Sequence, residues 1–190
     1  SAPTGAVTIV GAVKEGQTVT ANHTNIQDDD DIVAGSHSYQ WQANGLDITN
    51  ATSKAYTLTQ SEVGKTVTVE VKYTDGKGIE EIVESAATSA VANLNTVGSI
   101  TTINGTVSTG STLTAGAITD EDGTTGGSSV TATYQWQSAA TANGTYDNIT
   151  GATNSTFVPI QAQVGQFIQV VATYTDSQGF SEVVTSAATT

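Results

Sequence analysis

The four residues Tyr-Gln-Trp-Gln at positions 39–42 determine how this chain is expected to fold, because they return unchanged at positions 134–137. The stretches around them repeat in the same order. The matching pairs are residues 48–52 and 149–153, residues 73–75 and 174–176, and residues 85–88 and 186–189. Recurrence over this length indicates tandem copies of one structural module. We therefore predict two domains, residues 1–94 and residues 95–190, each of an ordinary domain size.

The composition excludes several kinds of partner. The chain has 18 acidic and 5 basic residues and a formal net charge of −13, so we expect no nucleic-acid partner, because phosphate backbones are bound through Lys and Arg. No apolar run approaches the roughly 18–20 residues of a membrane-spanning helix, and we expect no direct membrane insertion. The absence of Cys and Met excludes disulfides and thiolate metal sites. Because the repeat pattern is already under way at Ser1, we expect a fragment of a longer protein.

Short stretches rich in Thr and Val alternate with turn residues along both copies, a pattern typical of strands. In residues 66–73 the apolar side chains occupy every second position, which predicts a strand with one buried face. In the first copy we predict strands at residues 6–11, 17–24, 38–43, 46–49, 54–59, 65–74 and 79–87. The last of these has adjacent apolar residues, Ile82 and Val83, and a bulge would accommodate both.

Several short strands in each copy indicate an all-β protein made of two tandem immunoglobulin-like antiparallel β-sandwich domains. Such a sandwich holds a buried tryptophan on its third strand. Trp41 and Trp136 stand at that place, so we predict that each lies in a core between two sheets. The second copy differs by six extra residues after Trp136, within residues 138–147.

The order of the repeated motifs carries a resemblance to a known group of proteins. Gly-x-x-x-x-Gly-x-x-(Leu/Val)-Thr-Ala, an acidic loop, Tyr-Gln-Trp-Gln, Ile-x-x-Ala-Thr, Val-Gly and Tyr-Thr-Asp-x-x-Gly follow one another in both copies. They resemble the tandem immunoglobulin-like repeats of large bacterial surface proteins, the RTX-type adhesins. The resemblance implies a secreted, cell-surface protein whose repeats are spacers in a stalk that calcium often rigidifies. It also implies that the partners are neighbouring repeats of the same polypeptide, and it leaves the ligand of the parent adhesin unknown.

The acidic loops carry the clearest chemistry in the sequence. Residues 28–31 are four consecutive aspartates, and residues 120–123 form an Asp-Glu-Asp-Gly loop in the second copy. In an immunoglobulin-like sandwich these loops share one pole with the turns that carry Asp75 and Asp176. Converging carboxylates repel one another unless a cation neutralises them, and Ca²⁺ prefers six to eight oxygen ligands. The predicted Ca²⁺ ligands are Asp28, Asp30, Asp75, Asp120, Asp122 and Asp176; the alternative is a set of solvated turn residues.

The calcium hypothesis extends to the mechanics of the stalk. The second copy follows the linker directly, so a Ca²⁺ ion at its acidic pole would take carbonyl ligands from residues 94–97. Extracellular modules bind Ca²⁺ with dissociation constants of roughly 10⁻⁴–10⁻³ M. Affinity in this range would fix the angle between folded domains more than it would drive folding.

Other candidate sites receive little support from the sequence. His23 and His37 have no second His at ligand spacing, and we expect them at the surface or at a strand edge. No Ser or Thr pairs with a His at a repeated position, so we expect no catalytic triad and no enzyme. Two rivals to a spacer remain open. One is a module that binds glycan or protein through residues 138–147, which include Tyr146; the other is an accessory domain of an enzyme.

Overall fold

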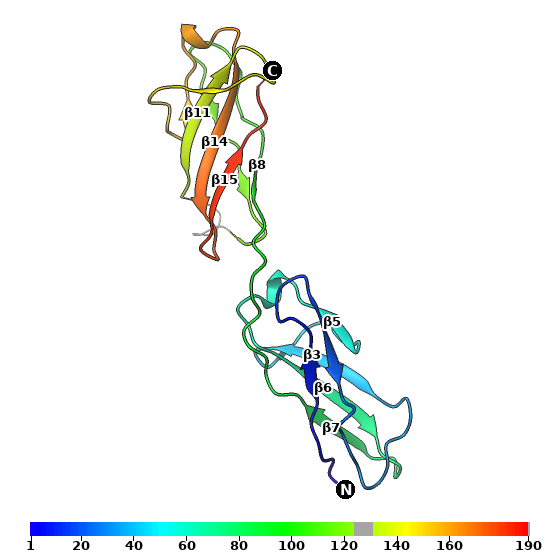
Figure 1. Ribbon diagram of the computed structural model, residues 1–190. Coiled ribbons are helices and arrows are strands. Elements are labelled where there is room, and N and C mark those ends of the chain that lie inside the picture. The colour runs from blue at the N-terminus through cyan, green and yellow to red at the C-terminus, as the bar shows by residue number, and fades with distance from the viewer. Residues whose placement is uncertain (124–130, 190) are drawn as a thin grey trace. The chain divides into compact units, whose positions relative to one another are not determined.

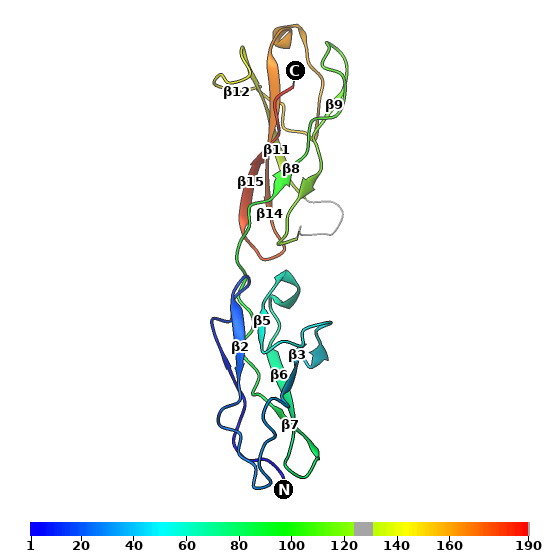
Figure 2. The same ribbon diagram turned by 90° about the vertical axis from the view of Figure 1, so that its right-hand side faces the viewer.

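The computed structural model describes residues 1–123 and 131–189 of a chain that divides into two compact units, Ser1–Leu94 and Asn95–Thr190 (Figures 1 and 2). Strands and turns dominate both units. In the described ranges the only helices are two single-turn 3₁₀ helices, η1 (Gln60–Glu62) and η2 (Gln161–Gln163). The prediction of an all-β protein with two immunoglobulin-like antiparallel sandwiches is confirmed.

The first unit is a sandwich of two antiparallel sheets. One sheet has the strand order β1-β2-β5 and the other has the order β4-β3-β6-β7. The strands are β1 (Thr8–Val10), β2 (Thr18–Asn22), β3 (Ser38–Ala43), β4 (Leu46–Asp47), β5 (Ala55–Thr57), β6 (Val67–Thr74) and β7 (Glu80–Glu84). Each lies within one of the predicted ranges, and β3 matches its range at both ends.

The second unit repeats the larger sheet in the order β12-β11-β14-β15, with β11, β14 and β15 as neighbouring arrows in Figure 1. The opposite layer consists of two short pairs, β8–β10 and β9–β13. The strands are β8 (Ser99–Ile100), β9 (Leu113–Thr114), β10 (Ile118–Thr119), β11 (Thr133–Ala139), β12 (Asp147–Asn148), β13 (Thr156–Phe157), β14 (Phe167–Thr175) and β15 (Ser181–Thr185).

Between β9 and β10 the chain passes close to residue 101. A Cβ atom at Gly116 would lie 2.1 Å from the carbonyl oxygen of Thr101, so only glycine fits this approach. The Thr101 hydroxyl oxygen also accepts a hydrogen bond from the Ala117 N–H. β9 ends at Thr114, two residues before Gly116, whereas its counterpart β2 continues to Asn22, the residue that corresponds to Gly116.

Alternation of side chains along β6 and β14 builds the two cores. In β6 the buried positions are Val67, Val69, Val71 and Tyr73, as a period of two requires. Trp41 and Trp136 are fully buried, which confirms their predicted place. Each indole N–H donates a 2.9 Å hydrogen bond to a backbone carbonyl, at Ser53 and at Asn154 respectively.

The predicted bulge in the last strand of the first unit is wrong within Glu80–Glu84. β7 pairs with β6 in a regular ladder that sets Val83 opposite Val71 and Ile82 opposite Lys72. Val83 packs on the core, whereas Ile82 is 50% exposed. Because the ladder is regular, Glu81 lies on the same side of the strand as Val83.

Candidate functional site

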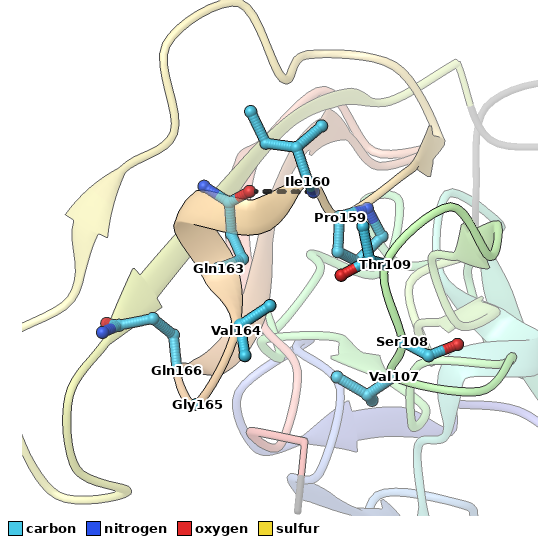
Figure 3. A pocket seen from close by; sticks show the side chains of 9 residues that line it. All are labelled: Val107, Ser108, Thr109, Pro159, Ile160, Gln163, Val164, Gly165 and Gln166. Atoms are coloured by element: carbon cyan, nitrogen blue, oxygen red, sulfur yellow. Dashed lines mark hydrogen bonds between the residues drawn. The ribbon is translucent and has the colours of Figure 1, made fainter.

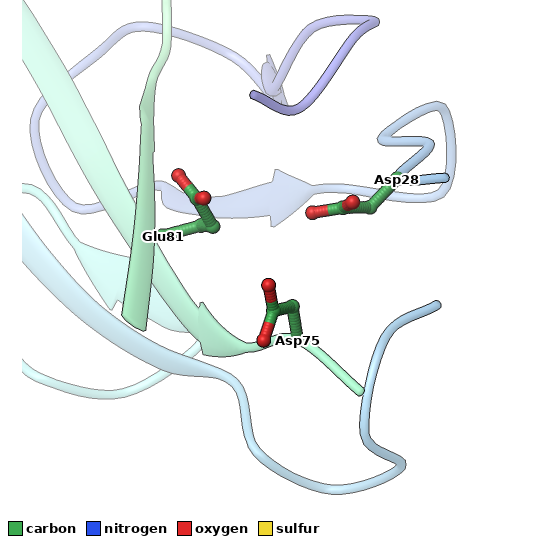
Figure 4. A group of neighbouring side chains, drawn as sticks. All are labelled: Asp28, Asp75 and Glu81. Atoms are coloured by element: carbon green, nitrogen blue, oxygen red, sulfur yellow. The ribbon is translucent and has the colours of Figure 1, made fainter. Parts of the chain in front are cut away.

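The first unit brings three carboxylates together at one end of its sandwich. Asp28 lies in the loop after β2, Asp75 follows β6, and Glu81 lies on β7. Each offers an oxygen atom within 4.8 Å of the others. Figure 4 shows the three side chains directed toward one shared space. We call this group the acidic cluster of the first unit.

Asp75 is 2% exposed and organises the turn between β6 and β7. Its Oδ1 atom accepts hydrogen bonds from the N–H groups of Lys77 (2.9 Å) and Ile79 (2.7 Å). Its backbone N–H also donates to the Ile79 carbonyl. A short polar side chain that bonds to the backbone of its own turn explains why the chain reverses here.

Asp28 is tied to the core by a tyrosine. Its Oδ2 atom accepts a 2.7 Å hydrogen bond from the Tyr73 hydroxyl, and its Oδ1 atom accepts a 2.9 Å hydrogen bond from the Asp30 N–H. The Asp30 N–H and the Tyr73 hydroxyl hold the pKa of Asp28 below its ordinary value, so this carboxyl stays ionised. Burial, and then the hydrogen bond to Asp28, raise the pKa of Tyr73.

The side chain of Asp30 contacts cations, whereas its backbone N–H donates to Asp28 of the cluster. Its carboxylate pairs with the Lys77 ammonium at 2.5 Å and with the amino group of Ser1. The Lys77 and Ser1 contacts hold the pKa of Asp30 below its ordinary value. Across residues 1–123 and 131–189, both ion pairs of this pole go to Asp30, and the cluster carboxylates have none.

The donor atoms of the acidic cluster fit a calcium ion. All three are carboxylate oxygens, which are the ligands that Ca²⁺ prefers. They come from two loops and a strand and lie close enough for one ion to contact all of them. Asp28, Asp75 and Glu81 are therefore the residues that would hold the ion, and bound Ca²⁺ would supply positive charge to a group that has no ion pair among the described residues.

In the second unit the equivalent carboxylates make direct hydrogen bonds. Asp120 accepts from the Tyr174 hydroxyl and, at 2.9 Å, from the Asp122 N–H. Asp176 is 1% exposed, and its Oδ1 atom accepts from the N–H groups of Gln178 and Phe180. Tyr174 thus repeats the contact of Tyr73. In the part of the chain that the structure describes, three carboxylates approach within 4.8 Å only in the first unit.

Asp122 and Glu182 hold the segment through which the chain enters the second unit. Asp122 is 2% exposed, and its Oδ2 atom accepts from the N–H of Thr96 at 2.6 Å and from its hydroxyl at 3.1 Å. Glu182 accepts a 2.9 Å hydrogen bond from the side-chain amide of Asn95. In the first unit the corresponding segment pairs Thr4 with Gln27 through two backbone hydrogen bonds, next to Asp28. The acidic pole of each unit therefore contacts its own incoming chain.

Sequence reasoning missed the glutamates of this site. Glu81 and Glu182 stand at matching places in the two copies, and each lies opposite the core tyrosine, Tyr73 or Tyr174, in the strand ladder. The repeated glutamate was a usable signal. The regular ladder of β7 sets the direction of the Glu81 side chain, which a bulge in that strand would have changed.

The two histidines come together although the sequence separates them. The rings of His23 and His37 stack with their centroids 4.1 Å apart, and the Nδ1 atom of His23 lies 3.3 Å from the Tyr39 hydroxyl. Both histidines are half-buried. Burial lowers the pKa of each, and the neighbouring His37 lowers that of His23 further.

The extra residues of the second unit form the connection between β11 and β12. Tyr146, at the end of this connection, is half-buried. Its hydroxyl donates a 3.1 Å hydrogen bond to the carbonyl of Ala142. The tyrosine is thus hydrogen-bonded within its own loop.

Both helices in the described residues are single 3₁₀ turns, and neither could span a membrane.

A comparison with protein-family models finds no match, and a comparison with curated proteins finds none either. Solved structures of similar fold include the FN1–FN3 domains of chicken CNTN1, with 13% identity and a TM-score of 0.38 over 98% of this chain and 66% of that chain. A Ca²⁺-stabilized adhesin with which an Antarctic bacterium binds ice gives 16% identity and a TM-score of 0.39 over 100% of this chain and 49% of that chain.

A 1.5-MDa bacterial ice-binding adhesin gives 18% identity and a TM-score of 0.33, covering 97% of this chain and 64% of that chain. The chain thus spans less than two thirds of each of these three structures. The solved structures that this chain resembles thus include domains of adhesins, and the resemblance concerns the fold alone.

Proposed function

We propose that this chain is a pair of spacer repeats from the stalk of a bacterial cell-surface adhesin. The observation that carries the proposal is the place of the acidic pole. In both units, carboxylates or their immediate neighbours contact the segment by which the chain enters the sandwich, at Gln27 in the first unit and at Asp122 in the second. Residues that hold the entering segment restrict the direction in which the chain enters the domain, which is the role of a spacer in a stalk.

The mechanism is mechanical. A stalk needs each folded repeat to hold the chain that leads into it, because few other contacts oppose bending between small domains. Hydrogen bonds from Asp122 and Glu182 restrain Asn95 and Thr96 in the second unit. The net charge of −13 keeps neighbouring stalks soluble and apart. The proposed location is therefore secreted and on the cell surface, with neighbouring repeats of the same polypeptide as partners.

We further propose that Ca²⁺ binds the acidic cluster of the first unit through Asp28, Asp75 and Glu81. The ion would link the loop after β2 to the turn between β6 and β7. For a site with a dissociation constant of roughly 10⁻⁴–10⁻³ M, Ca²⁺ at ten times that value adds about 1.4 kcal/mol to the stability of the unit. A gain of this size stiffens a folded pole without deciding whether the domain folds.

Calorimetric titration of Ca²⁺ into the chain tests this site. Asp28→Asn and Asp75→Asn should abolish the binding heat. Asp29→Asn is the matched control, because it removes the same charge from an exposed position of the same loop. Equal heats for all three variants would place the ion elsewhere or show that it only screens charge. A glycan screen of the same protein tests the rival function, and specific binding that is lost when residues 138–147 are shortened would favour an adhesive module.

A further inference from the structure

In the first unit a short segment after β7, residues 91–94, lies in a groove between two loops. Residues 13–15 form one wall of this groove, and residues 63–65 form the other. Val91 pairs in parallel with Val63, and Ala92 pairs in parallel with Lys14. Four backbone hydrogen bonds hold the segment: Gly64 N–H to Val91 C=O (3.0 Å), Val91 N–H to Lys65 C=O (2.9 Å), Ala92 N–H to Val13 C=O (3.1 Å) and Glu15 N–H to Ala92 C=O (2.9 Å).

The segment also completes the core of the first unit. Val91 is 2% exposed and belongs to the buried hydrophobic cluster around Trp41. Val13 and Val63, one from each wall, are half-buried and pack against the same cluster. Val91 therefore bridges the two walls with apolar contacts, and the backbone hydrogen bonds fix its direction.

The second unit has the same two walls. Residues 107–109 correspond to residues 13–15, and residues 164–166 correspond to residues 63–65. The Gly110 N–H donates to the Pro159 carbonyl at 3.0 Å, as the Gly16 N–H donates to the Leu58 carbonyl at 2.9 Å. The walls enclose a groove of about 280 Å³, with Val107 and Val164 on different segments that border it (Figure 3).

Apolar side chains and backbone groups line this groove. Val107 is 38% exposed, Val164 is 58% exposed and Ile160 is 61% exposed. The four backbone groups that bind the segment in the first unit have counterparts here, and none of them has a hydrogen-bond partner within residues 1–123 and 131–189. These counterparts are Gly165 N–H, Gln166 C=O, Val107 C=O and Thr109 N–H.

The segment that follows the last strand, residues 85–88 or 186–189, has the same register in both units. The Thr88 N–H donates to the Val67 carbonyl at 3.0 Å, and the Thr189 N–H donates to the Ile168 carbonyl at 2.8 Å. Each threonine hydroxyl oxygen accepts in return from the N–H of that same partner. By this correspondence, a segment attached after residue 190 would reach the groove in the register that residues 90–94 have in the first unit.

We propose that this groove of the second unit binds an extended polypeptide segment in continuation of residues 186–189, with a valine at the register position of Val91. Two apolar walls flanked by alternating N–H and C=O groups recognise an extended backbone with small apolar side chains, in the way that added strands are bound at sheet edges. The proposal rests on the comparison of the two units and is independent of calcium.

The test extends the 190-residue chain after Thr190 by Ala-Val-Ala-Asn-Leu, the sequence of residues 90–94. Hydrogen exchange of the Gly165 and Thr109 amides is measured by NMR. Insertion of the segment should slow exchange at both amides by about ten-fold or more, because each gains a backbone hydrogen bond in a stable element. The unfolding temperature of the second unit, followed by the Trp136 indole signal, should rise as well.

Two matched proteins make the test specific. One carries the same extension with Asp in place of Val, and the other combines the original extension with Val164→Asp. Both should leave the two amides exchanging as they do in the chain without an extension. Unchanged exchange with the valine extension would overturn the proposal, and equal slowing with the Asp extension would show that added length alone causes the effect.

Discussion

The Tyr73 hydroxyl donates a 2.7 Å hydrogen bond to Asp28, and it thereby joins the core of the first unit to its acidic pole. Tyr73 is 1% exposed, so the bond lies at the boundary between the apolar interior and the charged loops. The second unit repeats the relationship between Tyr174 and Asp120. Through this hydrogen bond, a buried core residue fixes the position of the acidic loop in each unit.

Removing the Tyr73 hydroxyl should destabilise the first unit. Tyr73→Phe keeps the buried ring but leaves the Asp28 carboxylate without this donor, and we expect a loss of about 1–3 kcal/mol, the usual cost of a lost hydrogen bond to a charged group. Urea unfolding followed by the Trp41 indole signal measures it. Tyr146→Phe is the control, since its hydroxyl bonds only within its own surface loop among the described residues; comparable losses in both variants would argue against a special role for Tyr73.

Truncation of either tryptophan should unfold its own unit first. Trp41 and Trp136 are fully buried, and replacement of such a residue by Ala costs roughly 3–5 kcal/mol. Because each unit holds one of the two tryptophans, the remaining indole signal reports the untouched unit. That signal should keep its unfolding midpoint, and a lower midpoint of that signal would show that the stabilities of the two units are coupled.

Acid should weaken the first unit in two stages. The pKa values of His23 and His37 are lowered in the folded state from about 6.5. Their contribution to the stability of the first unit is therefore complete above pH 6.5 and decreases as the pH falls below that value. The pKa values of Asp28 and Asp30 are lowered from 3.8, and their contribution is lost only as the pH falls below that value. The second unit has no histidine.

Denaturation midpoints of the two indole signals, recorded from pH 8 to pH 3, separate these stages. The decline below pH 6.5 should affect the first unit only and should disappear in the double variant His23→Gln with His37→Gln. An equal decline in the second unit would assign the effect to the overall charge of the chain.

The filled groove of the first unit gives a further prediction. Val91→Ala should cost about 1–3 kcal/mol, because it removes buried methyl groups from a packed site. Val33→Ala makes the same chemical change at a residue that is 45% exposed and should change the stability of the unit by less than about 0.5 kcal/mol. Thermal unfolding of the two variants measures the difference, and equal midpoints would show that Val91 adds little to the core.

The repeat and the strand periodicity predicted most of the fold. The alternation in residues 66–73 depends only on which side chains face the core, so β6 and its partner β3 followed directly from the sequence. The short pairs β8–β10 and β9–β13 were less predictable. Gly116, between β9 and β10, closely approaches Thr101, and this is a contact between segments that no local pattern encodes.

The sequence predicted which loops form the acidic pole, but not which residues their carboxylates contact. Asp28 and Asp75 were expected to meet because sandwich topology places their loops at one end. Glu81 required the register of β7, which the adjacent apolar residues Ile82 and Val83 obscured. The contact of Asp122 with Thr96 depends on how the incoming chain folds back onto the pole, and sequence spacing gives no measure of this.

Hydrogen exchange of the 190-residue chain, measured by NMR in millimolar Ca²⁺ and then in chelator, tests the proposed stiffening of the first unit's acidic end most directly. The N–H of Ile79 donates to Asp75, and the N–H of Gln27 donates to the Thr4 carbonyl. We expect both amides to exchange more slowly in Ca²⁺ and to return to faster exchange in chelator, with no response to Ca²⁺ in Asp28→Asn with Asp75→Asn. Asp29→Asn should respond as the unaltered chain does. Identical exchange in Ca²⁺ and in chelator, together with an unchanged unfolding temperature of the first unit, would contradict the account and leave these carboxylates as turn-forming residues.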